Sequence, residues 1–290
     1  MDSAKYAILF IKHVIYTGKS ERGYMSKIKA LFVDIDGTLI SEKQSRVTPA
    51  EEQAFVRLRE QGIKVCIATG RHMQEICYGD LTGNIVFDGF VTLNGQYCLA
   101  VGPDGQSQVV YQNCIDQADI RRLVEYLKQT HTSCVFLEDR QMYVNLLDER
   151  LISESERIGV PIPEQQPLEN ALKGRIIQVI PFVEEEREAE ILKLMPHCEQ
   201  TRWSDLAIDI VPKGGSKAVG ISRMLTWFSL EPKEIMAIGD GHNDMEMLQY
   251  AGIGVAMGNA SEAVKACADY VTGDVNAGGL VMALRHFGLV

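Results

Sequence analysis

The sequence has no surplus of positive charge. Lys and Arg number 29 against 39 Asp and Glu, which gives the 290-residue chain a formal net charge of -10. A protein that binds along nucleic acid needs Lys and Arg concentrated against the phosphates, so a nucleic-acid partner is not predicted. An acidic protein that handles an anionic substrate must neutralise that substrate locally, with a metal ion or a few placed cations.

Long apolar runs and paired cysteines are also missing. No run approaches the roughly 20 apolar residues that a membrane-spanning helix needs, so no membrane association is predicted. The seven cysteines are an odd number and include no Cys-x-x-Cys pair. This usage favours buried thiols in a reducing compartment over a disulfide framework or a zinc site, and it predicts a cytoplasmic protein.

The phosphate loop of P-loop kinases is absent as well. No segment fits G-x-x-x-x-G-K-[ST], and Gly214-Gly215-Ser216-Lys217 is too short and has the wrong order. A P-loop kinase is therefore disfavoured. What is present is an ordinary globular composition, with 46% hydrophobic and 23% charged residues, which predicts a real core.

The first 26 residues stand apart from the rest. Their apolar stretch, 6–16, is interrupted by Lys12 and His13, and it has neither the charge pattern nor the cleavage site of a signal peptide. The segment could be an extra strand or helix, or a dispensable extension ahead of a start at Met25. We favour the extension.

From residue 27 onward, strand and helix patterns alternate. Buried strands are predicted at 28–34, 64–69 and 90–93, with helices after 48 and 72. Thr48, Pro49 and Glu51 form the pattern of a capping box with proline in the first turn, which marks a helix start. The same alternation returns at 235–268. This rhythm predicts an α/β fold with a doubly wound, parallel-sheet, Rossmann-like core.

The pattern changes between the two alternating parts. Residues 111–204 mix β-branched and aromatic segments with charged helices such as 184–194, which indicates an inserted α+β unit. The predicted organisation is an N-terminal extension at 1–26, a core built from 27–110 and 205–290, and an insertion at 111–204.

The strongest chemical signal is the segment Asp34-Ile35-Asp36-Gly37-Thr38. Two carboxylates two residues apart leave the end of a predicted strand, where open α/β sheets place their ligands. Carboxylates near a substrate phosphate suit Mg²⁺. Taken alone, the segment is about as compatible with a solvated turn.

Three further segments fall at strand ends or helix starts. Each is weak alone, because a hydroxyl or Lys at a helix start is usually a cap or solvated surface. Their shared feature is a group that could bind phosphate or metal at such an end. They are Thr69-Gly70-Arg71, Lys213-Gly214-Gly215-Ser216-Lys217 and Gly239-Asp240-Gly241-His242-Asn243-Asp244. Four such segments in order are hard to assign to chance.

With these motifs the sequence resembles the haloacid dehalogenase-like superfamily, and specifically its Cof-type phosphatases with a class IIB α+β cap. The resemblance covers residue 27 to the end, including the late segment 251–260. It is dense in the core and vaguer through the insertion. One departure is Ala218 after Lys217, where many relatives have glycine.

The resemblance implies roles for individual residues. Asp34 would be the nucleophile that forms an aspartyl-phosphate, and Asp36 the general acid and then base. Mg²⁺ would be held by Asp34, the backbone carbonyl of Asp36, and Asp240, with Asp244 behind them. Phosphate or substrate contacts would come from Ile35, Thr69, Gly70, Arg71, Lys217 and Asn243.

The substrate implied is a small phosphorylated metabolite, such as a sugar phosphate, and the assembly a monomer or homodimer. Arg140, Asn145 and Arg202 are candidate cap contacts, although a plain surface role is as compatible with each. His242 is more typical of a loop lining than of a ligand. Two alternatives stay open: a phosphotransferase or phosphosugar mutase of the same superfamily, and a non-enzymatic sensor of a phosphorylated metabolite.

Overall fold

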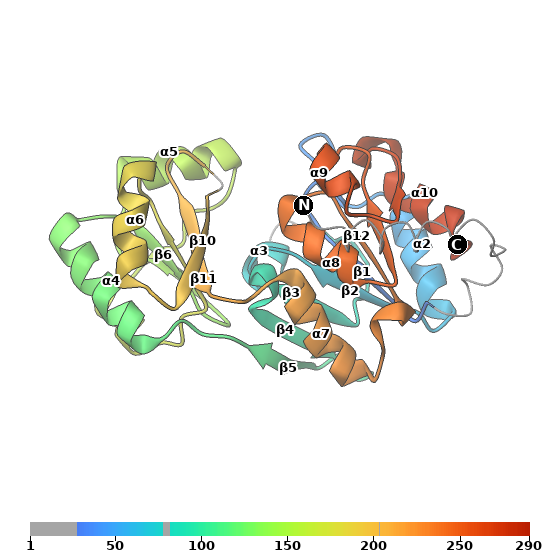
Figure 1. Ribbon diagram of the computed structural model, residues 1–290, viewed down its shortest axis with the longest axis horizontal. Helices are drawn as coiled ribbons and strands as arrows, with labels where there is room; N and C mark the ends of the chain where they lie inside the picture. The colour runs from blue at the N-terminus through green and yellow to red at the C-terminus, as the bar shows by residue number, and fades with distance from the viewer. Residues whose placement is uncertain (1–27, 78–81, 203) are drawn as a thin grey trace, which may run out of the picture.

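The computed structural model describes residues 28–77, 82–202 and 204–290. Within them the chain forms two sheets, each with its own helices, and two connections join the resulting units (Figure 1). The segment 1–26, predicted to be a dispensable extension, lies outside the described residues, so that expectation remains a prediction.

The larger sheet has eight strands among the described residues, and we call this sheet and its helices the core. Its spatial order is β14-β13-β12-β1-β2-β3-β4-β5. The strands are β1 (Ala30–Val33), β2 (Lys64–Ala68), β3 (Gly89–Thr92), β4 (Tyr97–Val101), β5 (Ser107–Gln112), β12 (Ile235–Gly239), β13 (Ile253–Ala256) and β14 (Tyr270–Val271). The core helices are α2 (Pro49–Glu60), α3 (Met73–Cys77), α7 (Lys217–Phe228), α8 (Met245–Tyr250), α9 (Glu262–Lys265) and α10 (Gly279–His286).

Helices cover both faces of this sheet, as a doubly wound fold requires. On the central strand β1, Leu31 and Val33 belong to an apolar cluster with α2 and α10. Ala30 and Phe32 point the other way, into a cluster with α7 and α8. All four side chains are fully buried, so β1 reads as a continuous apolar run rather than an alternating one.

The start of α2 follows the predicted capping box. The amide of Glu51 donates to the Thr48 hydroxyl at 3.3 Å, and the Glu51 carboxylate accepts from the Thr48 amide at 2.7 Å. Pro49 occupies the first turn, where its missing N–H has no partner to lose.

The sheet is not parallel throughout, which differs from the prediction. Strands from β14 to β3 run parallel, but β3–β4 and β4–β5 pair in antiparallel fashion. The links explain this, because short turns permit only antiparallel pairing while a parallel partner needs a long crossover. One of these turns contains Gly105 with φ +76, in the left-handed region that glycine adopts freely.

The second unit, which we call the cap, has a six-stranded sheet in the order β10-β11-β9-β6-β7-β8. Its strands are β6 (Cys134–Leu137), β7 (Met142–Val144), β8 (Glu164–Gln165), β9 (Gln178–Pro181), β10 (Cys198–Arg202) and β11 (Ile208–Pro212). Its helices are α4 (Gln117–Thr130), α5 (Glu149–Ile158) and α6 (Glu185–Leu194). Short 3-10 helices complete the described chain: η3 (Leu93–Gly95), η4 (Leu168–Leu172), η5 (Pro232–Glu234), η6 (His242–Asp244) and η7 (Val275–Ala277).

The units change at slightly different residues from those predicted. β5 stays in the core sheet to Gln112, and β11 pairs with β9 and β10 of the cap although it lies after 205. The chain thus leaves the cap sheet after Pro212, later than the predicted boundary at 204/205. An apolar strand such as β11 is compatible with either sheet, and only the pairing partners decide.

The two faces of the cap sheet have different neighbours. One packs on α4 and α6 through Phe136, Val179 and Ile191. The other contributes Val135 and Leu137 to an apolar cluster that also contains Leu93 and Tyr97 of the core. Burial of these apolar side chains thus stabilises the packing of the cap sheet on the core. No described helix combines the length and apolar character needed to cross a bilayer.

Gln96 joins the two connections between core and cap. It is fully buried, and its side-chain amide donates to the Pro212 carbonyl at 3.1 Å. Its Oε1 accepts from Nδ2 of Asn113 at 2.9 Å, and its own carbonyl accepts the Asn113 amide at 2.8 Å. Asn113 opens the first connection and Pro212 ends the cap, so one core side chain holds both.

We expect Gln96→Leu to destabilise the protein by about 2 kcal/mol, because it keeps similar volume but leaves buried partners on both connections unsatisfied. The matched control is Gln108→Leu on the exposed side of β5. Urea unfolding of both variants checks the difference. Equal unfolding midpoints would mean that Gln96 does not hold the connections.

Candidate active site

Polar residues meet where neighbouring strands end. Asp34 follows β1, Thr69 follows β2 and Asp240 follows β12, and these strands are adjacent in the order β12-β1-β2. Lys217 is the first residue of α7, whose N-cap is Ser216. The sheet therefore brings three of the four predicted segments together at its carboxyl edge, and α7 adds the fourth.

A buried ion pair network forms the centre. The ammonium of Lys217 lies 2.7 Å from Oδ1 of Asp34 and 2.6 Å from Oδ1 of Asp244. The exposed fractions of the Lys217, Asp34 and Asp244 residues are only 1%, 5% and 0%. Because removing one partner would leave buried charge uncompensated, the three groups are mutually dependent.

The carboxylates outnumber the ammonium groups here. Burial lowers the pKa of Lys217, but its attraction to Asp34 and Asp244 prevails, leaving it above its ordinary value and the group charged. Burial raises the pKa of Asp34 well above its ordinary value although Lys217 opposes the change, and Asp244 adds to the rise. Burial also raises the pKa of Asp240, to about 6. The protein's own charges thus leave room for another cation.

The acidic donors are arranged to accept such a cation. Carboxylate oxygens of Asp34, Asp240 and Asp244 all lie within 4.8 Å of one another. The set is entirely oxygen, which fits a hard divalent cation rather than zinc, for which Cys and His are common ligands. Both oxygens of Asp244 are already engaged, one with Lys217 and the other with the amides of Asp240 and Gly241 at 2.9 and 2.8 Å. Asp244 therefore binds Lys217 and shapes the loop that carries Asp240.

Two neighbours that the sequence analysis did not assign hold Asp240. The Thr38 hydroxyl donates to Oδ1 of Asp240 at 3.0 Å. The amide of Asn259 donates to Oδ2 of Asp240 at 3.1 Å and to the Gly37 carbonyl at 2.8 Å. Both lie in segments noted from the sequence, the first motif and 251–260, but nothing in the sequence joined them to Asp240.

Gly37 packs directly against Asp240. Its φ is +77, and a Cβ added there would lie 2.1 Å from Oδ2 of Asp240. Two separate constraints therefore favour glycine at position 37: the left-handed backbone conformation, and the lack of space for a side chain beside Asp240. Ile35, predicted as a phosphate contact, has a buried side chain in the core cluster, and its carbonyl accepts amides of the following turn. Only its backbone N–H could face a ligand.

The segment after β2 carries Thr69 and Arg71. Thr69 is buried, and its hydroxyl accepts the Arg71 amide at 3.1 Å. The Arg71 guanidinium donates two hydrogen bonds to the Asp36 carboxylate, from Nε to Oδ2 at 2.8 Å and from Nη2 to Oδ1 at 2.6 Å. This contact raises the pKa of Arg71. The Asp36 side chain is more than half exposed, unlike the buried Asp34.

The predicted cap contacts separate in the structure. The Asn145 side chain bonds the backbone of Cys134 and Thr132, and Arg202 pairs with Glu188, so both serve the cap itself. Arg140 lies at the border, where its carbonyl accepts from Gln74 of the core at 3.0 Å. Beside it, the buried His72 contacts the Glu138 carbonyl through Nε2 at 2.8 Å, a contact that sequence reasoning missed.

Asn243 is exposed, and Nδ2 of its side chain donates to Oδ1 of Asn94 at 2.9 Å. His242 in the same loop is exposed too, and the loop-lining role expected for it stays a prediction. Gly70 lies beside the Asn94 side chain. Asn94 thus lies between Gly70 and Asn243, two of the residues predicted to bind phosphate.

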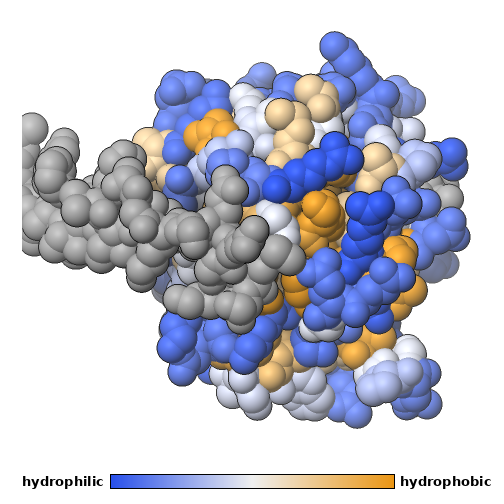
Figure 2. Space-filling model, turned by 90° about the vertical axis from the view of Figure 1, so that its right-hand side faces the viewer, coloured by the Kyte–Doolittle hydropathy of each residue, from blue (hydrophilic) through white to orange (hydrophobic). Residues whose placement is uncertain are grey.

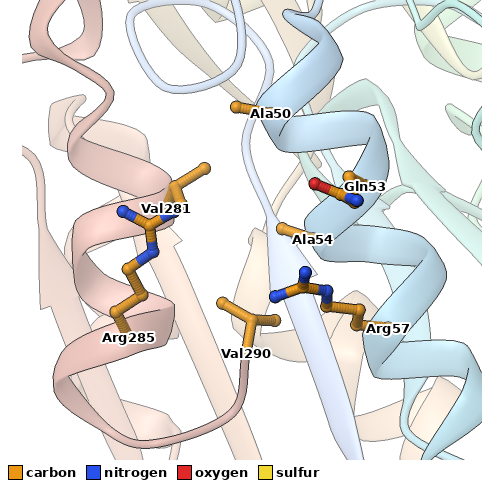
Figure 3. A pocket seen from close by; sticks show the side chains of 7 residues that line it. All are labelled: Ala50, Gln53, Ala54, Arg57, Val281, Arg285 and Val290. Atoms are coloured by element: carbon orange, nitrogen blue, oxygen red, sulfur yellow. The ribbon is translucent and has the colours of Figure 1, made fainter.

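A separate small hollow, about 30 Å³, lies between α2 and α10 (Figure 3). Its lining residues are Ala50, Gln53, Ala54, Arg57, Val281, Arg285 and Val290. This side of the core shows apolar groups interspersed with hydrophilic ones (Figure 2). The hollow contains none of the predicted site residues, so the candidate active site is the carboxylate cluster at the strand ends.

The fold and this site define a class: an α/β enzyme with an inserted cap and a carboxylate cluster suited to phosphoryl chemistry. The sequence pattern of haloacid dehalogenase-like hydrolases matches residues 31–284. YkrA of Bacillus subtilis, assigned as a phosphatase, is 31% identical over 264 residues, covering 90% of this chain and 98% of YkrA. The chain therefore belongs to the haloacid dehalogenase-like hydrolase family, and it is an enzyme of the phosphatase class.

Solved structures agree with this assignment. A superfamily phosphatase of Bacteroides thetaiotaomicron is 35% identical, with a TM-score of 0.80 and coverage of 94% of this chain and 100% of that one. A sugar phosphatase of subclass IIB is also 35% identical, with a TM-score of 0.74 over 90% of this chain and 100% of its own. The Cof-type resemblance and the capped α/β fold are confirmed.

We expect Gly37→Ala to lower phosphatase turnover by about 100-fold, because a Cβ there displaces Asp240 and small misplacements of catalytic groups are costly. The matched control is Gly105→Ala. That residue has nearly the same φ, +76, with nothing within 4 Å of an added Cβ. Both variants should lose about 1 kcal/mol of stability from the left-handed backbone. Equal activity of the two would show that Asp240 tolerates displacement.

Proposed function

We propose that the protein is a Mg²⁺-dependent phosphatase that hydrolyses small phosphorylated metabolites through an aspartyl-phosphate on Asp34. The observation that carries the proposal is the buried Asp34–Lys217–Asp244 network beside Asp240. A carboxylate can approach a phosphate dianion only where cations offset the repulsion. Here Lys217 supplies one cation and the surplus of carboxylates favours a second.

The residues suited to hold Mg²⁺ are Asp34, Asp240 and the backbone carbonyl of Asp36. When bound, the ion would neutralise charge on the phosphoryl oxygens and orient them. Lys217 holds one oxygen of Asp34 by a hydrogen bond, so the other oxygen can be directed at phosphorus. Thr69, Gly70 and Asn243 would donate hydrogen bonds to the phosphoryl oxygens.

In the first step, a carboxylate oxygen of Asp34 bonds to phosphorus while the ester P–O bond breaks. Asp36, as the general acid, gives its proton to the leaving alkoxide. In the second step, Asp36 takes a proton from water, the water oxygen bonds to phosphorus, and the bond to Asp34 breaks. Phosphate and the free carboxylate of Asp34 result, so the enzyme returns to its starting state.

Arg71 has a place in this scheme. In the structure it holds Asp36 by two charge-assisted hydrogen bonds. A substrate phosphate is a competing anion for the same guanidinium. We assign Arg71 to the substrate, so that binding frees Asp36 for proton transfer.

The substrates suggested are small because the cap sheet packs closely over the core through Leu93, Tyr97 and Leu137. Sugar phosphates are favoured by likeness to the subclass IIB sugar phosphatase. The proposal is tested by assaying free phosphate from sugar, nucleotide and cofactor phosphates. Transfer of the phosphoryl group to a second sugar instead of water would make the enzyme a phosphotransferase, and binding without turnover would make it a sensor.

Metal removal should abolish this activity. We expect exhaustive treatment with EDTA to stop phosphate release and added Mg²⁺ to restore it, because the site offers hard oxygen donors. Zn²⁺ should restore less, since the site has none of the Cys or His ligands it commonly uses. Undiminished turnover in metal-free protein would contradict the proposal.

Asp34→Asn and Asp36→Asn should fail in different ways. Asp34→Asn should lose essentially all turnover, because an amide is a poor nucleophile. Asp36→Asn keeps its backbone carbonyl and loses only proton transfer, which is typically worth about 10²–10⁴ in rate. Its loss should be large for a sugar phosphate and smaller for an aryl phosphate, whose phenolate leaves without protonation.

The measurement is turnover of both esters by each variant, with mass analysis for phosphate trapped on Asp34. Asp104→Asn, on an exposed turn, serves as the control for the same substitution. Equal losses on both esters without a trapped phosphoenzyme would restrict Asp36 to a structural or metal-binding role. An active Asp34→Asn would overturn the mechanism.

A further inference from the structure

The connection between β3 and β4 has an unusual backbone. Leu93, Asn94 and Gly95 have φ values of 51°, 52° and 87°, three consecutive residues in the left-handed region. Asparagine and glycine tolerate this region, but a leucine there costs about 1 kcal/mol or more. Such strain persists where the surroundings impose it, and it concentrates at functional sites.

The turn places Asn94 between two phosphate-site loops. Its Oδ1 accepts from Nδ2 of Asn243, in the loop after β12, at 2.9 Å. Its backbone N–H donates to the Thr69 carbonyl at 3.1 Å. Both polar atoms of its side chain lie 3.3 Å from where a Cβ on Gly70 would be, so it also covers the loop after β2.

The residues that follow keep this turn from moving. A Cβ on Gly95 would lie 2.0 Å from the carbonyl of Ser216, the N-cap of the helix that carries Lys217. Gln96 is buried and bonded to both connections between core and cap. The backbone that carries Asn94 is thus held by close packing against the start of α7 and by the hydrogen bonds of Gln96 to the two connections.

An amide can bind a phosphoryl oxygen only if its N–H group faces it. Asn243 is exposed, and its side chain would otherwise be free to rotate. By accepting one Asn243 N–H, Asn94 fixes that amide plane and leaves the second N–H for a ligand. Nδ2 of Asn94 lies beside Gly70, on the side of the loop after β2.

We propose that Asn94 is a positioning residue, which holds the Asn243 amide in the orientation that binds the phosphoryl group. The inference rests on the proposed function, because it takes Asn243 as a phosphate ligand. It adds a residue that no motif identified, and it gives the strained turn a purpose: only this backbone brings a β3–β4 side chain between the two loops.

The test uses Asn94→Gly, which removes the side chain but keeps a residue suited to positive φ. We expect the dissociation constant for inorganic phosphate, measured by calorimetry in Mg²⁺, to rise about tenfold, the scale of one hydrogen bond. Ser229→Gly is the matched control, since Ser229 has φ 55 at the exposed end of α7. It should bind phosphate as the unmodified protein does. The thermal midpoint of each variant verifies folding.

A double-mutant cycle then asks whether Asn94 acts through Asn243. In an Asn243→Ala background, Asn94→Gly should weaken phosphate binding less than threefold further. A full tenfold loss in that background, or no loss in the single variant, would overturn the inference. Failure of the unmodified protein to hydrolyse any phosphate ester would instead count against the proposed function, and phosphate titration would still report on Asn94.

Discussion

The burial of Lys217 between Asp34 and Asp244 is the interaction on which the site depends. A buried ammonium is stable only beside carboxylates, and buried carboxylates only beside cations, so the three positions constrain one another. Asp34 comes from the central strand, Asp244 from the loop after β12 and Lys217 from the start of α7. Any change that separates these elements exposes uncompensated charge. The network therefore links the two parts of the core, which are far apart in sequence.

The remaining excess of negative charge gives the site its chemistry. Asp240 is held by Thr38 and Asn259, against Gly37, in a position that raises its pKa to about 6. Under the proposed function, a cation and an anionic substrate would compensate the charge of these groups. Such local cost at a functional site is common, and the apolar clusters on both faces of the sheet offset it. Asp36 is more exposed than the other carboxylates of the site and is held by Arg71.

The turn at 93–96 contacts both the cap and the loops of the candidate site. Leu93 packs against the cap sheet, Asn94 lies between the phosphate-site loops, and Gln96 holds both connections. None of these roles has a local sequence signature. A leucine with positive φ contradicts its own preference, and the tertiary contacts on either side impose it. The antiparallel β4 and β5, the end of the cap at Pro212 and the contact of His72 with Glu138 were likewise unpredicted, because each depends on which segments pair in space.

The sequence by itself determined the class of fold and most of the chemical groups. Periodicity, the capping box at Thr48 and polar residues at strand ends are local signals, so the motifs from Asp34 to Asp244 could be found without a structure. Tertiary structure decided which groups touch: that Lys217 bonds two carboxylates, that Arg71 holds Asp36, and that Asn145 and Arg202 serve the cap rather than the site. The physical reason is that propensity and capping act over a few residues, whereas ion pairing and burial act between segments whose distance along the chain carries no information about their distance in space.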